Sequence, residues 1–246
     1  MVVDPWDMEQ LRILAAKVDC EISSIFITHT HRDHVEGTHS YLSSLPESKV
    51  PMPIFCHQIV TDQVSGSQPI KGGDRFMSGN IEVLETPGHR PEHMSLFLKS
   101  AFWRRHDPSK GLTEVSCVSS PLFIAGDCLF DSGIGNCKNG GDVSTLFETV
   151  SKTLMGLPES TLIFPGHDYR QRNLEFALSI EPTNNDIDKA QNSNCLFPST
   201  IREQMLVNPF FRVHQIAIET RLSELGLPHE TPYKRFSSLR TLRDSW

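Results

Sequence analysis

Three histidines and an aspartate stand within six positions in the segment THTHRDH, residues 28–34. His29 and His31 are two residues apart, so in an extended segment their imidazoles project to the same side. Asp33 and His34 follow in a stretch that can begin a short helix, and we expect their side chains to point elsewhere. Imidazole nitrogens and carboxylate oxygens bind zinc and similar cations readily. The segment therefore predicts metal binding, with two ions rather than one.

Three later segments repeat this signature, because each has a strand-like run, a small turn and then a residue that can bind metal. LETPGH ends at His89, LFIAGD ends at Asp127, and LIFPGH ends at His167. A glycine precedes each of these three residues and allows a tight turn. Core packing does not explain the set, because buried carboxylates beside imidazoles need a partner that offsets their desolvation. Two metal ions would be that partner.

The elements that would position these residues are short strands rich in β-branched and aromatic residues. A strand is expected to end in VVDP, and a helix follows at 8–18, where apolar residues repeat at helical spacing. A second helix is expected at 142–157, with Asp142 placed to cap it. The other predicted strands are residues 21–27, 52–56, 81–87, 93–99, 121–127 and 160–167.

The character of the chain changes after residue 167. Helical patterns are present in residues 170–180 and 209–226, and we expect no strand there. Residues 181–200 are polar and rich in Pro and Asn, which predicts a long connection between helices. We therefore predict two domains, a metal-binding domain at 1–167 and a helical, substrate-binding domain at 168–246.

The composition excludes several classes of function. The chain has 246 residues, 38% of them hydrophobic and 22% charged, as is ordinary for a globular protein. A net charge of -7 argues against nucleic acid and against an anionic membrane surface as partners. No apolar run is long enough to span a membrane. The six cysteines are scattered without a CxxC pair, which predicts reduced thiols. We expect a cytoplasmic protein, or one of the mitochondrial matrix if the N-terminus is incomplete.

The motif HxHxDH, present as His29, His31, Asp33 and His34, resembles the signature of the metallo-β-lactamase superfamily. Four further strings, GDCLF, LPESTLIFPGHDY, NLEFALSIEP and PSTIREQMLVNPFFRV, resemble the hydroxyacylglutathione hydrolase (glyoxalase II) family across nearly the whole chain. The resemblance implies an α+β fold, namely an αββα sandwich followed by a C-terminal helical domain. Members of the family normally have further strands before the segment that matches VVDP, and these are expected to be missing here.

The resemblance also implies a complete set of metal ligands. The cofactors expected are two divalent metal ions, with zinc as the first choice and iron or manganese as alternatives. Asp127 would bridge the two ions. One ion would take His29, His31 and His89, and the second would take Asp33, His34 and His167.

The implied activity is hydrolysis of a small-molecule glutathione thioester, such as S-D-lactoylglutathione, to a hydroxy acid and glutathione. Two ions can lower the pKa of a shared water and polarise the carbonyl that the resulting hydroxide attacks, so no serine or cysteine nucleophile is expected. Lys138, Tyr169 and Arg212 are the residues expected to hold the acidic substrate tail. Asn136 and Gln215 stand where the family has basic residues, which predicts weaker discrimination for glutathione.

Two other functions are compatible with the sequence. A persulfide dioxygenase has the same superfamily fold and uses a single iron held by two histidines and one aspartate, and oxygen uptake with glutathione persulfide would reveal it. A non-catalytic, metal-binding isoform would bind metal without turnover. The sequence leaves the choice between a monomer and an oligomer open.

Overall fold

The structure is a computed structural model that describes residues 1–101, 105–107, 111–113, 119–193 and 198–246. The chain packs as two compact units. The first unit comprises Met1–Glu85 and Glu92–Ser119, and the second comprises Thr86–Pro91 and Ser120–Trp246. The predicted domain boundary after residue 167 stays a prediction, because it does not coincide with this division by packing.

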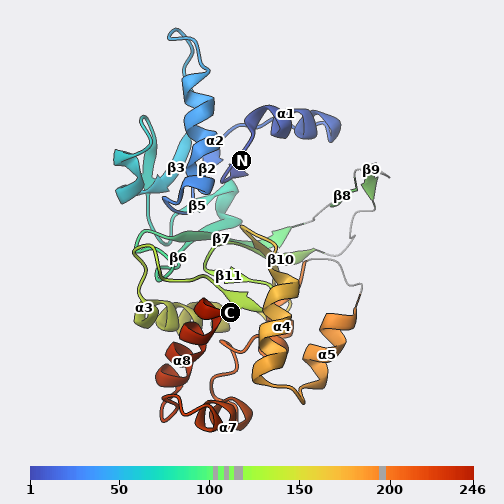
Figure 1. The fold of residues 1–246 in the computed structure, drawn as a ribbon. Helices are drawn as coiled ribbons and strands as arrows, with labels where there is room; N and C mark the ends of the chain where they lie inside the picture. Colours follow the sequence, from blue (N-terminus) through green and yellow to red (C-terminus); the bar gives the residue numbers. More distant parts are fainter. Residues whose placement is uncertain (102–104, 108–110, 114–118, 194–197) are drawn as a thin grey trace. The chain divides into compact units, whose positions relative to one another are not determined.

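The first unit contains a parallel sheet whose strands follow the order of the chain (Figure 1). Parallel strands need crossover connections, and helices α1 and α2 provide the first two. The core of this sheet is apolar, since Ile25 and Phe26 are completely buried. The elements are β1 (Val2–Val3), α1 (Met8–Lys17), β2 (Ile25–Phe26), α2 (Arg32–Ser43), β3 (Ile54–His57) and β4 (Gln68–Ile70).

Antiparallel strands complete the first unit. In β6 buried residues alternate with more exposed ones, as expected for a sheet with one buried face, whereas β7 is buried at its start and more exposed toward its end. Short 3-10 helices lie at Gln58–Asp62 and Met77–Gly79. The strands are β5 (Arg75–Phe76), which pairs with β6 (Ile81–Glu85), then β7 (Met94–Ala101), which pairs with β6, and the pair β8 (Arg105–Asp107) and β9 (Gly111–Thr113).

The second unit begins with strands that carry buried, apolar residues. Strand β10 (Ser120–Gly126) pairs in parallel with β13 (Leu162–Pro165), so their carboxyl ends lie at the same edge. A hairpin of β11 (Leu129–Phe130) and β12 (Gly133–Ile134) follows β10. Helix α3 (Val143–Glu148) continues into a π-helical turn at Thr149–Thr153 and a 3-10 turn at Leu154–Gly156.

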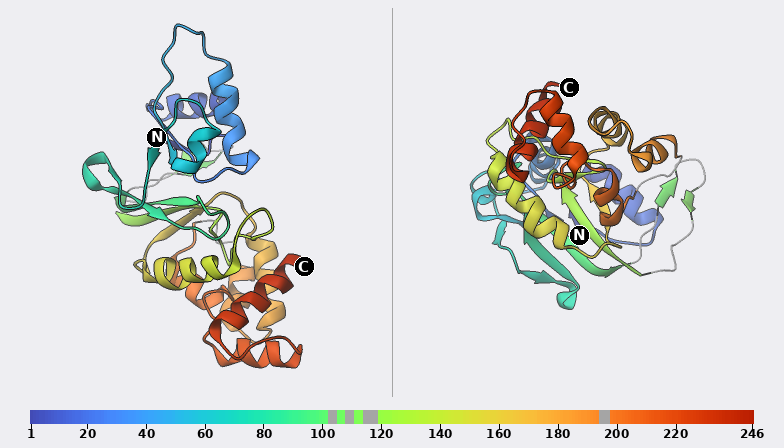
Figure 2. Two further views of the ribbon diagram at one scale, coloured as in Figure 1. Left: turned by 90° about the vertical axis from the view of Figure 1, so that its left-hand side faces the viewer. Right: turned by 90° about the horizontal axis from the view of Figure 1, so that it is seen from below.

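The rest of the second unit is helical. Helix α4 lies beside α5, and α8 lies against both α3 and α7 (Figure 2). Thr200 and Glu203 form a capping box at the start of α6, and Thr231 caps α8, whose first residue is a proline. The helices are α4 (Arg170–Ile180), α5 (Asn185–Asn192), α6 (Ile201–Val207), α7 (Ile216–Glu224) and α8 (Pro232–Ser245).

Two predicted helical features are wrong. The predicted connection at 181–200 contains helix α5, because the Asn184 side chain caps it and the buried Ile187 anchors it. The predicted helix at 209–226 begins only at Ile216. Before it, the Asn208 side chain accepts from the backbone N–H of Phe210. The segment around the phenylalanines therefore forms turns in place of a helix.

Two expectations from composition concern the cysteines and membrane-spanning helices of the described part of the chain. Cys20, Cys56, Cys128 and Cys137 are free thiols, whereas Cys117 and Cys195 lie outside the described residues. Among the described helices, none has the length and apolar content that crossing a bilayer requires.

Candidate functional site

Asp4 organises the first group of predicted ligands. It follows β1, and its parallel neighbour β2 leads to Thr28, so the two residues lie at one edge of the sheet. The Asp4 carboxylate accepts from the Thr28 backbone N–H at 2.8 Å and from the Thr28 hydroxyl at 2.7 Å. It also accepts from Nδ1 of His34 at 2.7 Å. A ring whose Nδ1 donates has Nε2 as its basic nitrogen, so Asp4 prepares His34 to bind a cation.

His29 is oriented by the same network. Its Nδ1 lies 2.8 Å from the Thr28 hydroxyl, which donates to Asp4 and therefore accepts from His29. This assigns the basic nitrogen of His29 to Nε2, which lies 3.0 Å from Nδ1 of His31. The ring of His34 is also close, with its centroid 4.0 Å from that of His29. His34 thus lies beside His29, where we had expected it to point elsewhere.

Two buried residues hold the loop between His29 and His31. Thr30 donates to the Glu92 carboxylate through its backbone N–H at 3.2 Å and through its hydroxyl at 2.5 Å. Glu92 and His93 are both 1% exposed, and the His93 ring lies 5.1 Å from that of His29. His93 is therefore placed to support His29.

The second unit brings together the other three predicted ligands. Asp127 follows β10 and His167 follows β13, at the shared edge of these parallel strands. Oδ2 of Asp127 lies 3.7 Å from Nε2 of His89 and 3.6 Å from Nε2 of His167. Asp127 thus stands between two imidazoles, which is the position that a bridging carboxylate requires.

Close backbone packing fixes the His89 loop. Nδ1 of His89 donates to the Asn136 carbonyl at 2.6 Å, which makes Nε2 the basic nitrogen on the side of Asp127. Gly88 has φ 130°, and a Cβ there would lie 2.4 Å from the backbone of Leu146. A side chain at this position is therefore excluded twice, by conformation and by space. Gly126 also has a positive φ, whereas none is found at the third turn glycine, Gly166.

The donor atoms fit a divalent cation. Two ligand atoms bound at about 2.1 Å to a tetrahedral ion lie roughly 3.4 Å apart, and the nitrogen and oxygen atoms of the two groups are separated by 3.0 to 3.7 Å. Asp4, His29 and His34 also offer ligand atoms that lie within 4.8 Å of one another. Imidazole and carboxylate together suit zinc, iron and manganese. The residues present therefore suit the predicted cofactors within each unit.

A cavity of about 280 Å³ in the second unit contains two of the predicted substrate residues, Lys138 and Tyr169. The Tyr169 ring stacks on the His167 ring at 5.3 Å, so one wall of this cavity touches a predicted metal ligand. The cavity is basic, because Arg172, Arg240 and Arg243 also line it. We call it the basic cavity.

Arg212, the third predicted substrate residue, does not line the basic cavity. Its guanidinium donates to both carboxylate oxygens of Glu181, at 2.7 and 2.8 Å, and to the Met205 carbonyl at 3.1 Å. Glu181 is only 4% exposed. These contacts hold α4 to the segment after α6, and the predicted contact of Arg212 with substrate stays a prediction.

Comparisons with known proteins identify the family of this chain. A family model described as hydroxyacylglutathione hydrolase C-terminus matches residues 168–246. The hydroxyacylglutathione hydrolase of Nitrosococcus oceani is 32% identical over 259 aligned residues, which cover all of this chain and 90% of the relative. The chain belongs to the hydroxyacylglutathione hydrolase family.

Solved structures identify the fold of this family member. A metallo-β-lactamase from Staphylococcus aureus matches with a TM-score of 0.56 at 18% identity, covering 98% of this chain and 64% of the other. ETHE1 from Myxococcus xanthus matches with a TM-score of 0.52 at 22% identity, covering 99% and 88%. The predicted α+β class with the metallo-β-lactamase fold is confirmed.

Sequence reasoning missed four residues that the structure adds to this hydroxyacylglutathione hydrolase site. Asp4 lies at the end of a predicted strand, as Asp127 does, so the same rule would have found it. The arginines of α8 were missed because no helix was predicted there, although Thr231 before Pro232 is a helix-start signal. Arg172 carried no signal, since an exposed arginine on a helix is ordinary. The four missed residues are Asp4, Arg172, Arg240 and Arg243.

Proposed function

We propose that the chain hydrolyses glutathione thioesters such as S-D-lactoylglutathione, giving a hydroxy acid and glutathione. Membership of the hydroxyacylglutathione hydrolase family supports the reaction class. The observation that carries the proposal is the Tyr169 ring, which lines the basic cavity and stacks on His167. A substrate whose anionic tail occupies that cavity would have its other end near the proposed metal ligands.

The proposed cofactors are two divalent metal ions, with zinc as the first choice and iron or manganese as alternatives. When bound, such ions activate water and polarise the thioester carbonyl. Asp127 is the proposed bridge, and the Asp4 and Asn136 contacts hold the histidines with Nε2 as the basic nitrogen. The residues proposed to hold the ions are His29, His31, Asp33, His34, His89, Asp127 and His167.

The proposed role of the basic cavity is to bind the carboxylates of glutathione. Lys138, Arg240 and Arg243 supply the positive charge, and Tyr169 supplies an aromatic wall. Asn136 departs from the family's basic residue, and its side chain accepts from the Lys138 backbone at 3.0 Å. It thereby shapes the turn that presents Lys138. Arg212 is retained as a proposed contact, supported by the resemblance alone.

The substrate is thus proposed to be a small molecule, with neither nucleic acid nor membrane as partner. Cytoplasmic localisation is likewise part of the proposal.

The test is release of free thiol from S-D-lactoylglutathione by purified protein of measured metal content. We expect turnover, and we expect Lys138→Ala to raise KM more than it lowers kcat, because a tail contact contributes uniform binding. Lys99→Ala, which removes a lysine of the first unit that pairs with Glu82, is the matched control. Metal-loaded protein that consumes oxygen with glutathione persulfide and releases no thiol from the thioester would overturn the proposal in favour of a dioxygenase. Bound metal without either reaction would favour a non-catalytic isoform.

A further inference from the structure

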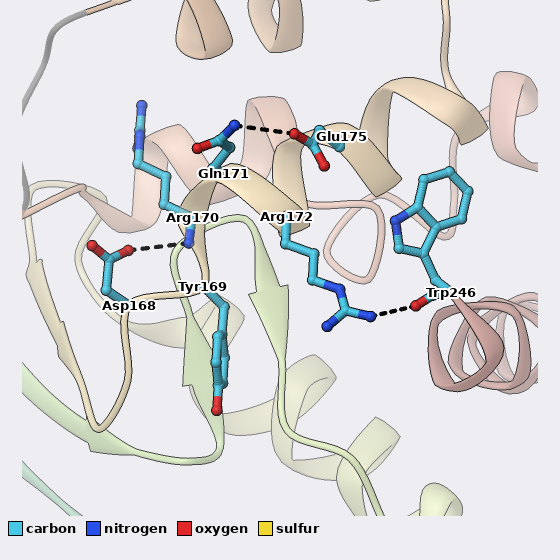
Figure 3. A pocket seen from close by; sticks show the side chains of 7 residues that line it. All are labelled: Asp168, Tyr169, Arg170, Gln171, Arg172, Glu175 and Trp246. Atoms are coloured by element: carbon cyan, nitrogen blue, oxygen red, sulfur yellow. Dashed lines mark hydrogen bonds between the residues drawn. The ribbon is translucent and has the colours of Figure 1, made fainter.

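The basic cavity shares a wall with a second, larger cavity of about 640 Å³ over the first turns of α4. Tyr169, Arg172 and Trp246 line both cavities. Figure 3 shows the Arg172 guanidinium between the Tyr169 and Trp246 side chains. The side chains of Arg172 and Trp246 therefore contribute to the wall between the two spaces.

A hydrogen bond and a ring contact hold this wall. The Arg172 guanidinium donates to the Trp246 carbonyl, and the indole packs edge-on against Phe176, with ring centroids 5.6 Å apart. Lys138 donates to the Asp244 carbonyl at 2.8 Å. The side chains of Arg172 and Lys138 thus donate to carbonyls at the end of α8, where the helix dipole is negative. Trp246 is 47% exposed, so surrounding structure does not lock its ring in place.

The charges around the wall favour an anion in the basic cavity. Burial lowers the pKa of Arg243, and the positive charges of Arg240 and Arg172 lower it further. Asp244, which pairs with Arg240 at 2.8 Å, offsets part of the repulsion between these like charges, and the carboxylate of a bound ligand would offset more of it. Arg172 therefore belongs electrostatically to the basic cavity, although its hydrogen bond goes to the wall.

We propose that Arg172 and Trp246 form a partition that limits the length of the thiol carrier accepted by the enzyme. The inference rests on the proposed function. About 280 Å³ is near the lower limit of ligand pockets, which span roughly 300–1,000 Å³, so the walls of this cavity contact only a short carrier. A longer carrier that stays in contact with the protein must pass the partition to reach the larger cavity. The two residues are thus specificity determinants for the end of the substrate remote from the scissile bond.

The test compares kcat/KM for S-D-lactoylglutathione with that for two lengthened analogues. One analogue carries two extra glycines on the glycine carboxylate, and the other carries them on the γ-glutamyl amine. In Trp246→Ala and in Arg172→Ala, we expect the ratio of lengthened to normal substrate to rise roughly tenfold for at least one analogue, as for other changes in pocket size. Trp246→Phe keeps an aromatic contact with Phe176 and should restore discrimination.

Gln171→Ala is the matched control, because Gln171 lines only the larger cavity and should leave the ratio unchanged. Arg172 is exposed, so its variant keeps the test decisive even if Trp246→Ala fails to fold. An active parent protein with the same ratios in both variants would overturn the partition alone. A parent that does not hydrolyse S-D-lactoylglutathione would overturn the proposed function and the partition with it.

Discussion

At the scale of single residues, one carboxylate serves three groups. Asp4 accepts from the Thr28 backbone, the Thr28 hydroxyl and His34, and through Thr28 it also orients His29. Its backbone has φ 45°, in the left-handed region that Asp and Asn tolerate better than most residues. The position therefore requires both a short polar side chain and an acceptor.

Replacing Asp4 by Asn should lower metal affinity by roughly 10–100-fold, as other losses of support for a histidine ligand do. Asn keeps the shape and tolerates the backbone, but its amide N–H₂ can donate to Nδ1 of His34 and so favour the wrong tautomer. Competition with a chelating dye measures the effect. Asp7→Asn is the control. Asp7 is the N-cap of α1, and asparagine is as good an N-cap residue as aspartate. Equal affinity in Asp4→Asn and the parent would refute the positioning role.

Arg212 gives a second prediction at this scale. Arg212→Ala should lower the free energy of unfolding by about 3–5 kcal/mol, because it leaves the buried Glu181 carboxylate without its charge partner. Urea denaturation measures this loss. Arg221→Ala removes an exposed pair with Glu224 and should cost below about 1 kcal/mol. Unchanged stability together with a raised KM would instead support the predicted contact with substrate.

At the scale of elements, the residue that begins helix α3 also holds the loop before His89. The backbone N–H of Asp142 donates to the Gly88 carbonyl at 2.8 Å, and the Asp142 side chain caps α3 through the Thr145 N–H at 2.7 Å. The same residue thus begins a helix and holds the turn before His89. A sequence pattern predicts the cap, but only the folded chain brings Gly88 to it.

Asp142→Ala should destabilise the protein by about 1 kcal/mol, and Asp142→Ser should recover most of the loss. The hydrogen bonds from the backbone and side chain of Thr145 lower the pKa of Asp142 below its usual 3.8. The stabilisation from its charge is therefore fully present above about pH 4 and is lost as the pH falls through the lowered pKa. Thermal midpoints measured from pH 7 to pH 3 should converge for the parent and Asp142→Ala. A constant difference across this range would exclude the charged cap.

At the scale of the whole molecule, the proposed ligands are distributed over both compact units. His29, His31, Asp33 and His34 belong to the first unit, and His89, Asp127 and His167 belong to the second. Within the second unit, His89, Asp127 and His167 come from distant segments, and such ligands are costly to hold together without a cation because their electronegative atoms repel one another. Metal binding should consequently stabilise the folded chain.

Removing the metal with a chelator should lower the thermal midpoint, since an ion that binds only the folded state stabilises it by mass action. Elemental analysis of the untreated protein should give close to two ions per chain. Asp127→Ala should lose more metal than His31→Ala, because a bridge serves both ions. Equal metal content in Asp127→Ala and the parent would contradict the bridge, and a well-folded protein that never binds metal would contradict the proposed cofactors.

Much of the site could be predicted from local patterns. The strands before Asp127 and His167 are apolar runs followed by polar residues. Such a pattern predicts the strand correctly because the apolar residues are the ones that become buried. Helix α5 could not be predicted with the same rules, because its polar residues hide a single buried Ile187. The late start of α7 depends on Asn208 and the buried aromatics around it, which are tertiary choices.

The sequence by itself determined the family, and it placed most of the candidate ligands after predicted strands, because spacing and residue chemistry are local properties of the chain. Only the tertiary structure decided which partners those residues acquire. Asp4 meets His34 across 30 positions, and Arg240, far along the chain, binds the carbonyls of Ile134 and Gly135. The ion pair of Arg212 with Glu181 is also formed only in the folded chain. Such pairs depend on the path of the backbone between them, and the physical requirement that buried charges find partners selects them only when the chain is folded.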